Sequence, residues 1–132
     1  ALRLMVELAN RPNDLIPLKD ISDKQRISLK YLEQIVTPLA RVGLVKSERG
    51  SQGGYRLTKS PEEYTLASIL HATEGSLAAV ACLEDHAPEC ARAGQCPTRP
   101  IWEKLDNLIE DYLGSITLAD FHEPAIPCKI EK

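Results

Sequence analysis

The chain has 132 residues, of which 43% are hydrophobic, 27% charged and 5% aromatic, a balance typical of one globular domain with an appended arm. Its longest uninterrupted apolar run, residues 77–83, is far shorter than the roughly 20 residues that cross a bilayer, which excludes a membrane-spanning helix. No secretory signal pattern opens the chain, so we expect a cytoplasmic protein.

The net charge of −3 conceals two halves of opposite sign. Residues 1–60 hold 11 Lys and Arg against 6 Asp and Glu, whereas residues 61–132 hold 5 against 13. A polyanion is attracted by the first half and repelled by the second. The overall negative charge therefore does not exclude a nucleic-acid partner.

The first half predicts three helices. Apolar residues of 2–9 recur on one helix face until the turn formers of 10–14, and because Ala1 already lies in this pattern we expect the N-terminus to be truncated. A second short helix is predicted over 18–25, with Leu18 and Ile21 turned inward. A third begins at the N-cap Ser28, ends before Gly43, and has an inward stripe of Leu29, Leu32, Ile35, Val36, Leu39 and Val42.

A β-hairpin is predicted directly after the third helix. Residues 44–49 and 55–58 have strand character and are separated by the glycine-rich stretch 50–54. In isolation such a stretch is more often a flexible surface turn, but after three helices it is interpreted as a wing. The predicted fold is mainly α with a small β-hairpin: a winged helix-turn-helix domain over 1–60, followed by a long C-terminal dimerisation helix.

The second half predicts three further parts. Residues 61–97 contain a helical turn opened by Ser60, a short helix over 66–75, and a loop without periodicity that carries cysteines. Residues 98–119 form a helix capped by Thr98, and residues 120–132 an extended tail. That helix has a continuous apolar stripe, which consists of Ile101, Trp102, Leu105, Leu108, Ile109, Tyr112, Leu113 and Ile116. The stripe either packs back on its own domain or, as we favour, pairs with the same helix of a second copy to give a homodimer.

The polar side of the third helix offers candidate DNA contacts. A recognition helix reads bases near its N-terminus, where the polar residues are Ser28, Lys30, Tyr31, Glu33 and Gln34. Glu33 suits a cytosine amino group, Gln34 an adenine, and Lys30 a guanine or a phosphate. The alternative is an ordinary solvated face with Tyr31 half-buried in the core. In the hairpin, Arg49 and Arg56 flank the tip, and Arg49 is expected in the minor groove.

Three cysteines lie on one loop between the two predicted functional parts. Cys82, Cys90 and Cys96 are separated by seven and five residues, whereas a zinc knuckle normally has two residues between paired cysteines. A disulfide set is disfavoured in a reducing compartment. Soft thiolates on a roomy loop suit an iron–sulfur cluster, with incidental thiols as the alternative.

Three long stretches resemble one known family. They are ALRLMVELA, ISLKYLEQIVTPLARVGLVKSERGSQGGYRLTK and WEKLDNLIEDYLGSITLADF, and together they cover most of the chain. The chain resembles the winged-helix transcription regulators that include IscR, NsrR and CymR, and most resembles the cluster-binding IscR-type members. The resemblance implies that Ser28, Tyr31, Glu33 and Arg49 match DNA-contact positions and that Cys82, Cys90 and Cys96 match cluster-binding cysteines.

Two departures from the family pattern concern the cysteine loop. The interval between the first and second cysteines is longer than in the enterobacterial cluster-assembly regulator, and Arg99 stands where that regulator has a histidine. Arg99 cannot ligate iron, which leaves the fourth ligand open, with His86 and Cys128 as internal candidates. In nitric-oxide-sensing relatives this ligand is an acidic residue near the N-terminus of the partner subunit.

The sequence therefore predicts a homodimeric DNA-binding regulator, acting as a repressor on a near-palindromic double-stranded operator. It would sense iron or redox status through a 2Fe–2S or 4Fe–4S cluster. The alternatives are a thiol-redox or cysteine-metabolism regulator without a cluster, and a metal-stabilised protein-interaction module. An enzyme is disfavoured, because no Ser/His/Asp set, paired carboxylates or phosphate loop is evident.

Overall fold

The structure is a computed structural model that describes residues 1–121, so the predicted extended tail from residue 122 onward lies outside the described residues. It confirms the mainly α fold with a small hairpin. The helices and strands are α1 (Leu2–Asn10), α2 (Leu18–Gln25), α3 (Leu29–Arg41), β1 (Val45–Glu48), β2 (Gly54–Leu57), α4 (Leu66–Glu74) and α5 (Arg99–Ser115). Three single helical turns are η1 (Pro61–Glu63), η2 (Ala81–Leu83) and η3 (Leu118–Asp120). Within this part of the chain, no helix is both long and apolar enough to span a membrane.

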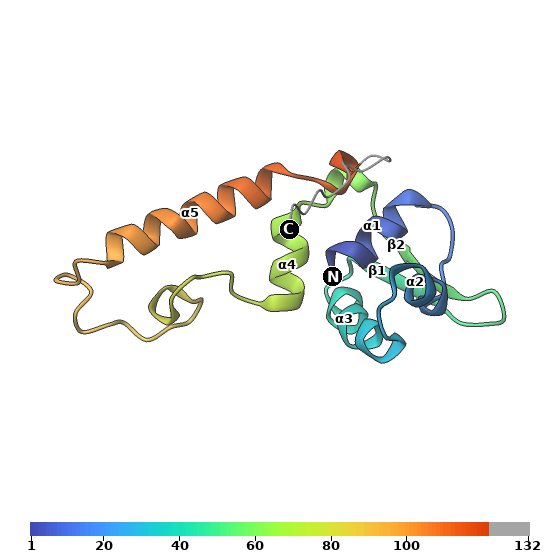
Figure 1. The fold of residues 1–132 in the computed structure, drawn as a ribbon, viewed down its shortest axis with the longest axis horizontal. Helices are drawn as coiled ribbons and strands as arrows, with labels where there is room; N and C mark the ends of the chain where they lie inside the picture. The colour runs from blue at the N-terminus through green and yellow to red at the C-terminus, as the bar shows by residue number, and fades with distance from the viewer. Residues whose placement is uncertain (122–132) are drawn as a thin grey trace, which may run out of the picture.

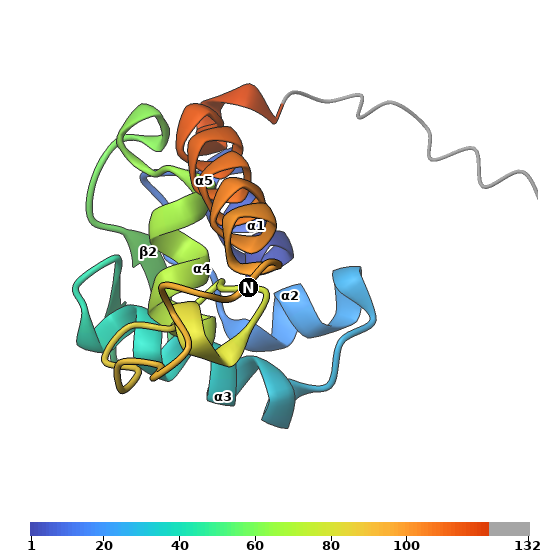
Figure 2. The same ribbon diagram turned by 90° about the vertical axis from the view of Figure 1, so that its left-hand side faces the viewer.

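The molecule has a compact end and an extended arm (Figure 1). Helices α1, α2 and α3 gather with the hairpin at one end, and α4 lies between them and the arm. Helix α5 extends away from this body, while α3 lies at the lower edge of the same view. In the view along the arm, α5 points towards the viewer, with α4 to its lower left and α2 to its lower right (Figure 2). The long helix α5 and the predicted recognition helix α3 therefore lie on different parts of the molecule.

The core is apolar and reaches beyond the first 60 residues. It is formed by Leu4, Met5, Leu8, Ile16, Leu18, Ile21, Leu32, Val36, Leu39, Val45, Leu57, Tyr64, Ile69 and Leu118. The inward positions of Leu18 and Ile21 are confirmed. The predicted inward stripe of α3 is wrong at both ends, because Leu29 is 41% exposed and Val42 58% exposed. The core contacts of α3 are made by its middle, through Leu32, Val36 and Leu39.

Both ends of α3 are fixed by local hydrogen bonds. The Ser28 hydroxyl accepts a hydrogen bond from the Tyr31 amide (3.1 Å), which confirms the predicted N-cap. At the other end, the Gly43 amide donates to Ala40 (3.1 Å) and the Leu44 amide to Leu39 (3.0 Å). Gly43 has a φ of +79°, so these bonds form a Schellman motif. The helix therefore presents its first turns in one defined backbone geometry.

The outer side of strand β2 pairs with Ile16, which lies well before the hairpin in the chain. Strands β1 and β2 are antiparallel, with Val45 opposite Leu57 and Glu48 opposite Gly54. Ile16 forms a β-bridge with Tyr55, in which each amide donates to the other carbonyl at 2.9 Å. A Cβ on Gly54 would lie 2.5 Å from the Ile16 carbonyl carbon, so this position requires glycine.

Tyr64 ties the base of the hairpin to η1. Its side chain is fully buried, and its hydroxyl donates to the Leu44 carbonyl (2.8 Å). The same oxygen accepts from the amides of Thr58 (2.8 Å) and Lys59 (3.0 Å). A buried hydroxyl with these partners is fully satisfied, so Tyr64 fixes both strands of the hairpin at their base.

Helix α5 is anchored at its C-terminal end. Thr117 forms a β-bridge with Thr65, the Leu66 amide donates to Ile116 (2.9 Å) and the Leu118 amide donates to Tyr64 (3.0 Å). Its N-terminal end follows the cysteine loop. Thr98 does occupy the N-cap position, but the predicted side-chain cap is wrong, because the Thr98 hydroxyl lies 3.3 Å from Cys96 Sγ instead.

The apolar stripe of α5 has two edges with different environments. Ile109 and Leu113 are half-buried, next to Glu110, which contacts α4 through His71. The other edge is exposed and consists of Ile101, Leu105, Leu108 and Tyr112. The fold-back alternative therefore describes one edge only, and no residue of the described part, 1–121, covers the second edge.

Candidate nucleic-acid interface and cysteine loop

The five candidate residues of the third helix all lie on the surface. Ser28, Lys30, Tyr31, Glu33 and Gln34 are exposed on the first two turns of α3. Tyr31 is 56% exposed, so the alternative in which it is half-buried in the core is wrong. Among residues 1–121, neither Lys30 nor Glu33 forms an ion pair, which leaves both charges available to a ligand.

The two arginines of the hairpin differ in their surroundings. Arg49 is exposed in the turn that follows β1 and forms no ion pair in the described part of the chain. Arg56 is half-buried on β2, opposite Lys46, with Nη2 3.4 Å from Glu48 Oε1. Glu48 thus partly neutralises Arg56, and Arg49 carries the free positive charge of the tip.

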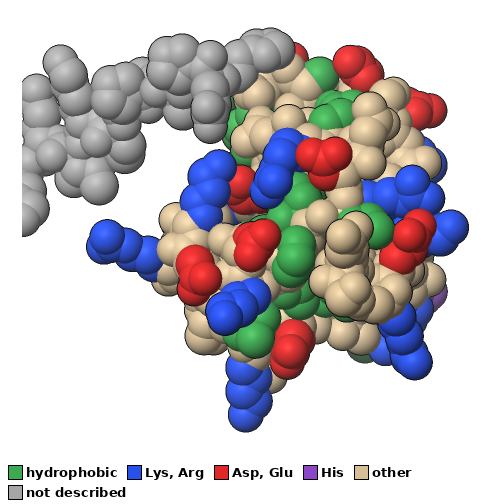
Figure 3. Space-filling model, turned by 90° about the vertical axis from the view of Figure 1, so that its right-hand side faces the viewer, with side chains coloured by type: hydrophobic (Ala, Val, Ile, Leu, Met, Phe, Trp, Pro, Cys, Tyr) green, Lys and Arg blue, Asp and Glu red, His purple; other side chains and the backbone are tan. Residues whose placement is uncertain are grey.

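The compact end of the molecule is rich in protruding cationic side chains. Figure 3 views this end, where Lys and Arg side chains stand out around the rim and Asp and Glu lie between them. The positive charge is spread around this end rather than confined to a single patch. Such a surface attracts a polyanion through many weak contacts.

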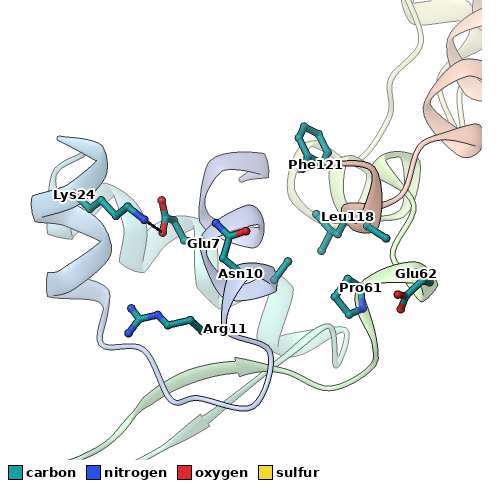
Figure 4. A pocket seen from close by; sticks show the side chains of 10 residues that line it. Glu7, Asn10, Arg11, Lys24, Pro61, Glu62, Leu118 and Phe121 are labelled. Carbon is teal, nitrogen blue, oxygen red and sulfur yellow. Dashed lines mark hydrogen bonds and ion pairs between the residues drawn. The ribbon is translucent and has the colours of Figure 1, made fainter. Parts of the chain in front are cut away.

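A buried carboxylate holds α2 against α1. Glu7 is 6% exposed and accepts a hydrogen bond from Lys24 Nζ at 2.9 Å (Figure 4). It also accepts a hydrogen bond from Gln25 Nε2. Arg3 donates to the side-chain and backbone oxygens of Gln25, both at 2.9 Å. A buried carboxylate without donors would be costly, so this network sets the position of α2 against α1. Sequence reasoning missed Glu7, since a single glutamate on an apolar helix face gives no signal of its partners.

The predicted cysteine ligands are present as free thiols on the loop between α4 and α5. Cys82 and Cys90 are exposed, and Cys96 is half-buried just before α5. Over residues 1–121, no three His, Cys, Asp or Glu side chains are placed to hold a metal ion. The structure therefore does not bring the three cysteines together as a preformed site. Their chemistry fits an iron–sulfur cluster, because soft thiols that solvent can reach lie on a loop with one short helical turn.

The comparisons with known proteins agree with this arrangement of elements. Residues 1–124 match the Rrf2 family, described as iron-dependent transcriptional regulators. The chain belongs to the Rrf2 family. An HTH-type transcriptional regulator of Neisseria meningitidis is 40% identical over 124 residues, which cover 93% of this chain and 82% of the relative.

Solved structures of Rrf2 regulators have the same fold. CymR, the global cysteine regulator of B. subtilis, superposes with a TM-score of 0.73 at 37% identity, covering 90% of this chain and 87% of CymR. IscR of T. potens superposes with a TM-score of 0.71 at 35% identity, covering 90% and 77%. This Rrf2 chain is thus a transcriptional regulator, which confirms the predicted resemblance and the prediction that it is not an enzyme.

The start of α5 polarises the thiol of Cys96 in this Rrf2 chain. Hydrogen bonds from the Thr98 side chain and from the backbone N–H groups of Thr98 and Arg99 lower the pKa of its thiol. The positive charge of Arg99 acts in the same direction. The thiolate is both the metal ligand and the nucleophile, so the start of α5 favours the reactive form of Cys96.

Arg99 itself is held by α5. Its Nε donates to Glu103 Oε1 at 2.8 Å, one helical turn further on. This hydrogen bond is the main reason that the pKa of Arg99 is raised, and Cys82 and Cys90 also contribute. Arg99 is therefore a cation held along α5 by Glu103, and not a ligand.

Within residues 1–121, His86 does not belong to any group of three or more His, Cys, Asp or Glu side chains that could hold a metal ion. His86 has a φ of +64° and lines an open groove with Glu84, Asp85 and residues of α4 and α5. Cys128 lies outside the described residues. The fourth ligand of a cluster therefore stays a prediction without a residue assigned.

Proposed function

We propose that this Rrf2 chain is a cytoplasmic, homodimeric repressor that binds a near-palindromic double-stranded operator and responds to iron or redox status through its cysteine loop. The observation that carries the DNA-binding part is the combination of a rigidly capped α3, exposed and polar over its first turns, with a glycine-rich wing tip that bears the free cation of Arg49. Both features are those of winged-helix DNA readers.

In this proposal the contacts divide into two groups. Glu33 and Gln34 reach base edges in the major groove, since a carboxylate accepts from cytosine and an amide pairs with adenine. Ser28, Lys30 and Tyr31 hold phosphates or, for Lys30, a guanine. Arg49 enters the minor groove. Arg56 leaves its ion pair with Glu48 and binds a phosphate of the DNA backbone instead.

The cluster part of the proposal depends on the residues of the loop. Cys82, Cys90 and Cys96 would hold the iron, with the Thr98 hydroxyl and the first amides of α5 stabilising the Cys96 thiolate. A bound iron–sulfur cluster supplies a group whose presence depends on iron, sulfide and oxidants. Three thiols on separate parts of the loop must converge to bind it, and the loop joins α4 to the free end of α5. Its ordering therefore changes how the two long helices of a dimer are held.

A thiol sensor without iron is the second candidate function. The lowered pKa of Cys96, the absence of an assembled thiol triad within residues 1–121, and the similarity to a cysteine regulator favour it. In that case the exposed thiols respond to oxidants directly. A metal-stabilised interaction module, the third alternative, would not bind a duplex at all.

One anaerobic experiment separates these functions. The chain is incubated with ferrous iron and sulfide, desalted, and assayed for visible absorption and for iron. We expect a coloured, iron-containing protein, and loss of colour when Cys82, Cys90 or Cys96 is replaced by serine. A colourless wild-type chain that still binds its duplex would favour the thiol sensor.

The DNA-binding part is tested on duplexes selected from a random-sequence library by the same chain. The affinity should fall steeply with added salt, and Arg49→Glu should reduce the slope of log affinity against log salt by about 1 to 2. Lys104→Glu, the same charge reversal on the exposed side of α5, is the control and should leave the slope unchanged. A chain that selects no duplex would support the interaction module.

A further inference from the structure

Leu29 is an apolar side chain on the surface that the proposed function assigns to DNA. It is the first residue of α3 and is 41% exposed. Two residues earlier Ile27 packs against the core, and three residues later Leu32 is fully buried. The chain therefore has core contacts on both sides of Leu29, while Leu29 itself contributes little to the core.

The neighbours of Leu29 are the candidate DNA contacts. Ser28 and Lys30 flank it in sequence, and both are exposed. Glu33 follows four residues later, and residues four apart lie one above the other on the same side of a helix. Leu29 and Glu33 thus share one edge of the exposed surface of α3, close to the end that enters the groove in winged-helix proteins.

The position of Leu29 is defined by its backbone. The Ser28 hydroxyl accepts from the Tyr31 amide (3.1 Å) and the Ser28 carbonyl from the Leu32 amide (3.1 Å), so the first turn is closed around Leu29. A side chain on a closed helical turn discriminates between ligands better than one on a mobile loop, because less freedom is lost on binding.

The chemistry of the major groove provides one partner for such a side chain. Leucine has no donor or acceptor, and the C5-methyl group of thymine is the apolar group that base edges present in this groove. We propose, on the basis of the proposed DNA-binding function, that Leu29 contributes to the choice of operator sequence by packing against a thymine methyl group. One helical turn rises about 5.4 Å and a base pair about 3.4 Å, so this thymine lies one or two base pairs from the base that Glu33 contacts.

The test replaces thymine by deoxyuridine, which removes only the methyl group. Each thymine of a duplex selected by the full chain is replaced in turn, symmetrically in both half-sites, and the dissociation constant is measured. Loss of one buried methyl group predicts about a fourfold weaker affinity per half-site, and about fifteenfold for the symmetric duplex, at one position only.

Two variants show whether Leu29 is the residue responsible. Leu29→Ala should bind the thymine and uracil duplexes with equal affinity. Val42→Ala, which shortens another exposed apolar residue at the opposite end of α3, should retain the full preference for thymine. Because Leu29 is exposed, its variant should unfold at the same temperature as the wild type, and this is measured on the same samples.

The outcomes separate this inference from the proposed function. If Leu29→Ala retains the thymine preference, or if no thymine of a tightly bound duplex is sensitive to its methyl group, Leu29 does not read DNA although the regulator binds it. If the wild-type chain selects no duplex, both the proposed function and the role of Leu29 are wrong.

Discussion

Gly54 shows how a single residue joins the wing to the rest of the domain. A Cβ at this position would lie 2.5–2.8 Å from the backbone atoms of Ile16, which cannot move without breaking the bridge to Tyr55. Gly54→Ala should therefore destabilise the fold by about 1–3 kcal/mol, the usual cost of overpacking. Urea denaturation gives this free energy directly.

Gly94→Ala is the matched control for that substitution. No heavy atom lies within 4 Å of the added Cβ, and Gly94 does not have a positive φ. Its effect should stay within about 0.5 kcal/mol, as for most surface changes. Equal stabilities of the two variants would show that the contact between β2 and Ile16 is not rigid.

At the residue scale, sequence reasoning succeeded where the partners are local. The Ser28 cap and the Gly43 terminus each depend on residues within one helical turn, so the residue types alone predict them. Glu7 and Tyr64 have partners 17 and 20 residues away, which only the packed chain brings together. The prediction that Leu29 faces the core is wrong for a related reason. Helical spacing shows which residues share a face of α3, but not which parts of that face other elements cover.

At the scale of elements, His71 and Glu110 connect α4 to α5. His71 Nε2 lies 2.8 and 3.0 Å from the two oxygens of Glu110, and Nδ1 lies 2.9 Å from the Gly75 carbonyl. The hydrogen bond to Glu110, then that to Gly75, raises the pKa of His71. The other titratable groups of this groove are Glu84, Asp85, His86 and Asp106, of which Asp85 also raises the pKa.

The raised pKa predicts how this connection depends on pH. A group whose pKa is higher in the folded state stabilises the fold fully below its unfolded pKa of about 6.5 and loses that effect as the pH rises through the folded value. The free energy of unfolding of the wild type should therefore exceed that of Glu110→Gln near pH 6, and the difference should shrink towards pH 8. Both side chains are more than a third exposed, so the difference stays below about 1 kcal/mol.

Glu103→Gln provides the comparison on the same helix. Its partner Arg99 remains charged throughout this range, so the effect of Glu103→Gln should not vary between pH 6 and 8. Urea denaturation at several pH values measures both variants. A constant difference for Glu110→Gln would mean that His71 does not change its protonation state across this range.

Element boundaries were predictable, whereas the environment of α5 was predictable only in part. Amphipathic spacing predicts α1 to α4 to within a residue or two, because these helices pack on one core. The helix predicted over 98–119 is wrong at its C-terminal end, because α5 ends at Ser115 and residues 118–120 form the separate turn η3. For α5 the same spacing gave one broad stripe, but the bridge between Thr65 and Thr117 orients the helix so that only one edge meets α4. Likewise, the type and spacing of the cysteines indicate ligands but not whether they converge.

At the scale of the whole molecule, the cysteine loop and the candidate DNA interface lie at different ends. The loop follows α4 and leads into the free end of α5, while α3 and the wing belong to the compact end (Figure 1). The bridge between Thr65 and Thr117 and the pair of His71 and Glu110 join α5 to α4, and α4 in turn packs against α3. In the proposed homodimer, a signal from the loop would therefore reach α3 most directly by changing how the two α5 helices hold the two domains relative to one another.

The exposed edge of α5 predicts where the two α5 helices of the proposed homodimer contact each other. Ile101, Leu105, Leu108 and Tyr112 recur at intervals of four, three and four residues, the spacing of a coiled-coil seam. In a two-fold dimer each substitution is present twice, so Leu108→Asp should bury two carboxylates and weaken dimerisation on the order of a hundredfold or more. Sedimentation velocity over a range of concentrations measures this directly.

Asn107→Asp introduces the same side chain one residue earlier, outside the seam, and should leave the dimer intact. The monomeric Leu108→Asp variant should also bind an operator far more weakly, because half-sites about 34–36 Å apart require two linked recognition helices. If Leu108→Asp remained dimeric at every concentration while its operator affinity was unchanged, the seam would have to lie elsewhere, and the exposed edge of α5 would need another partner.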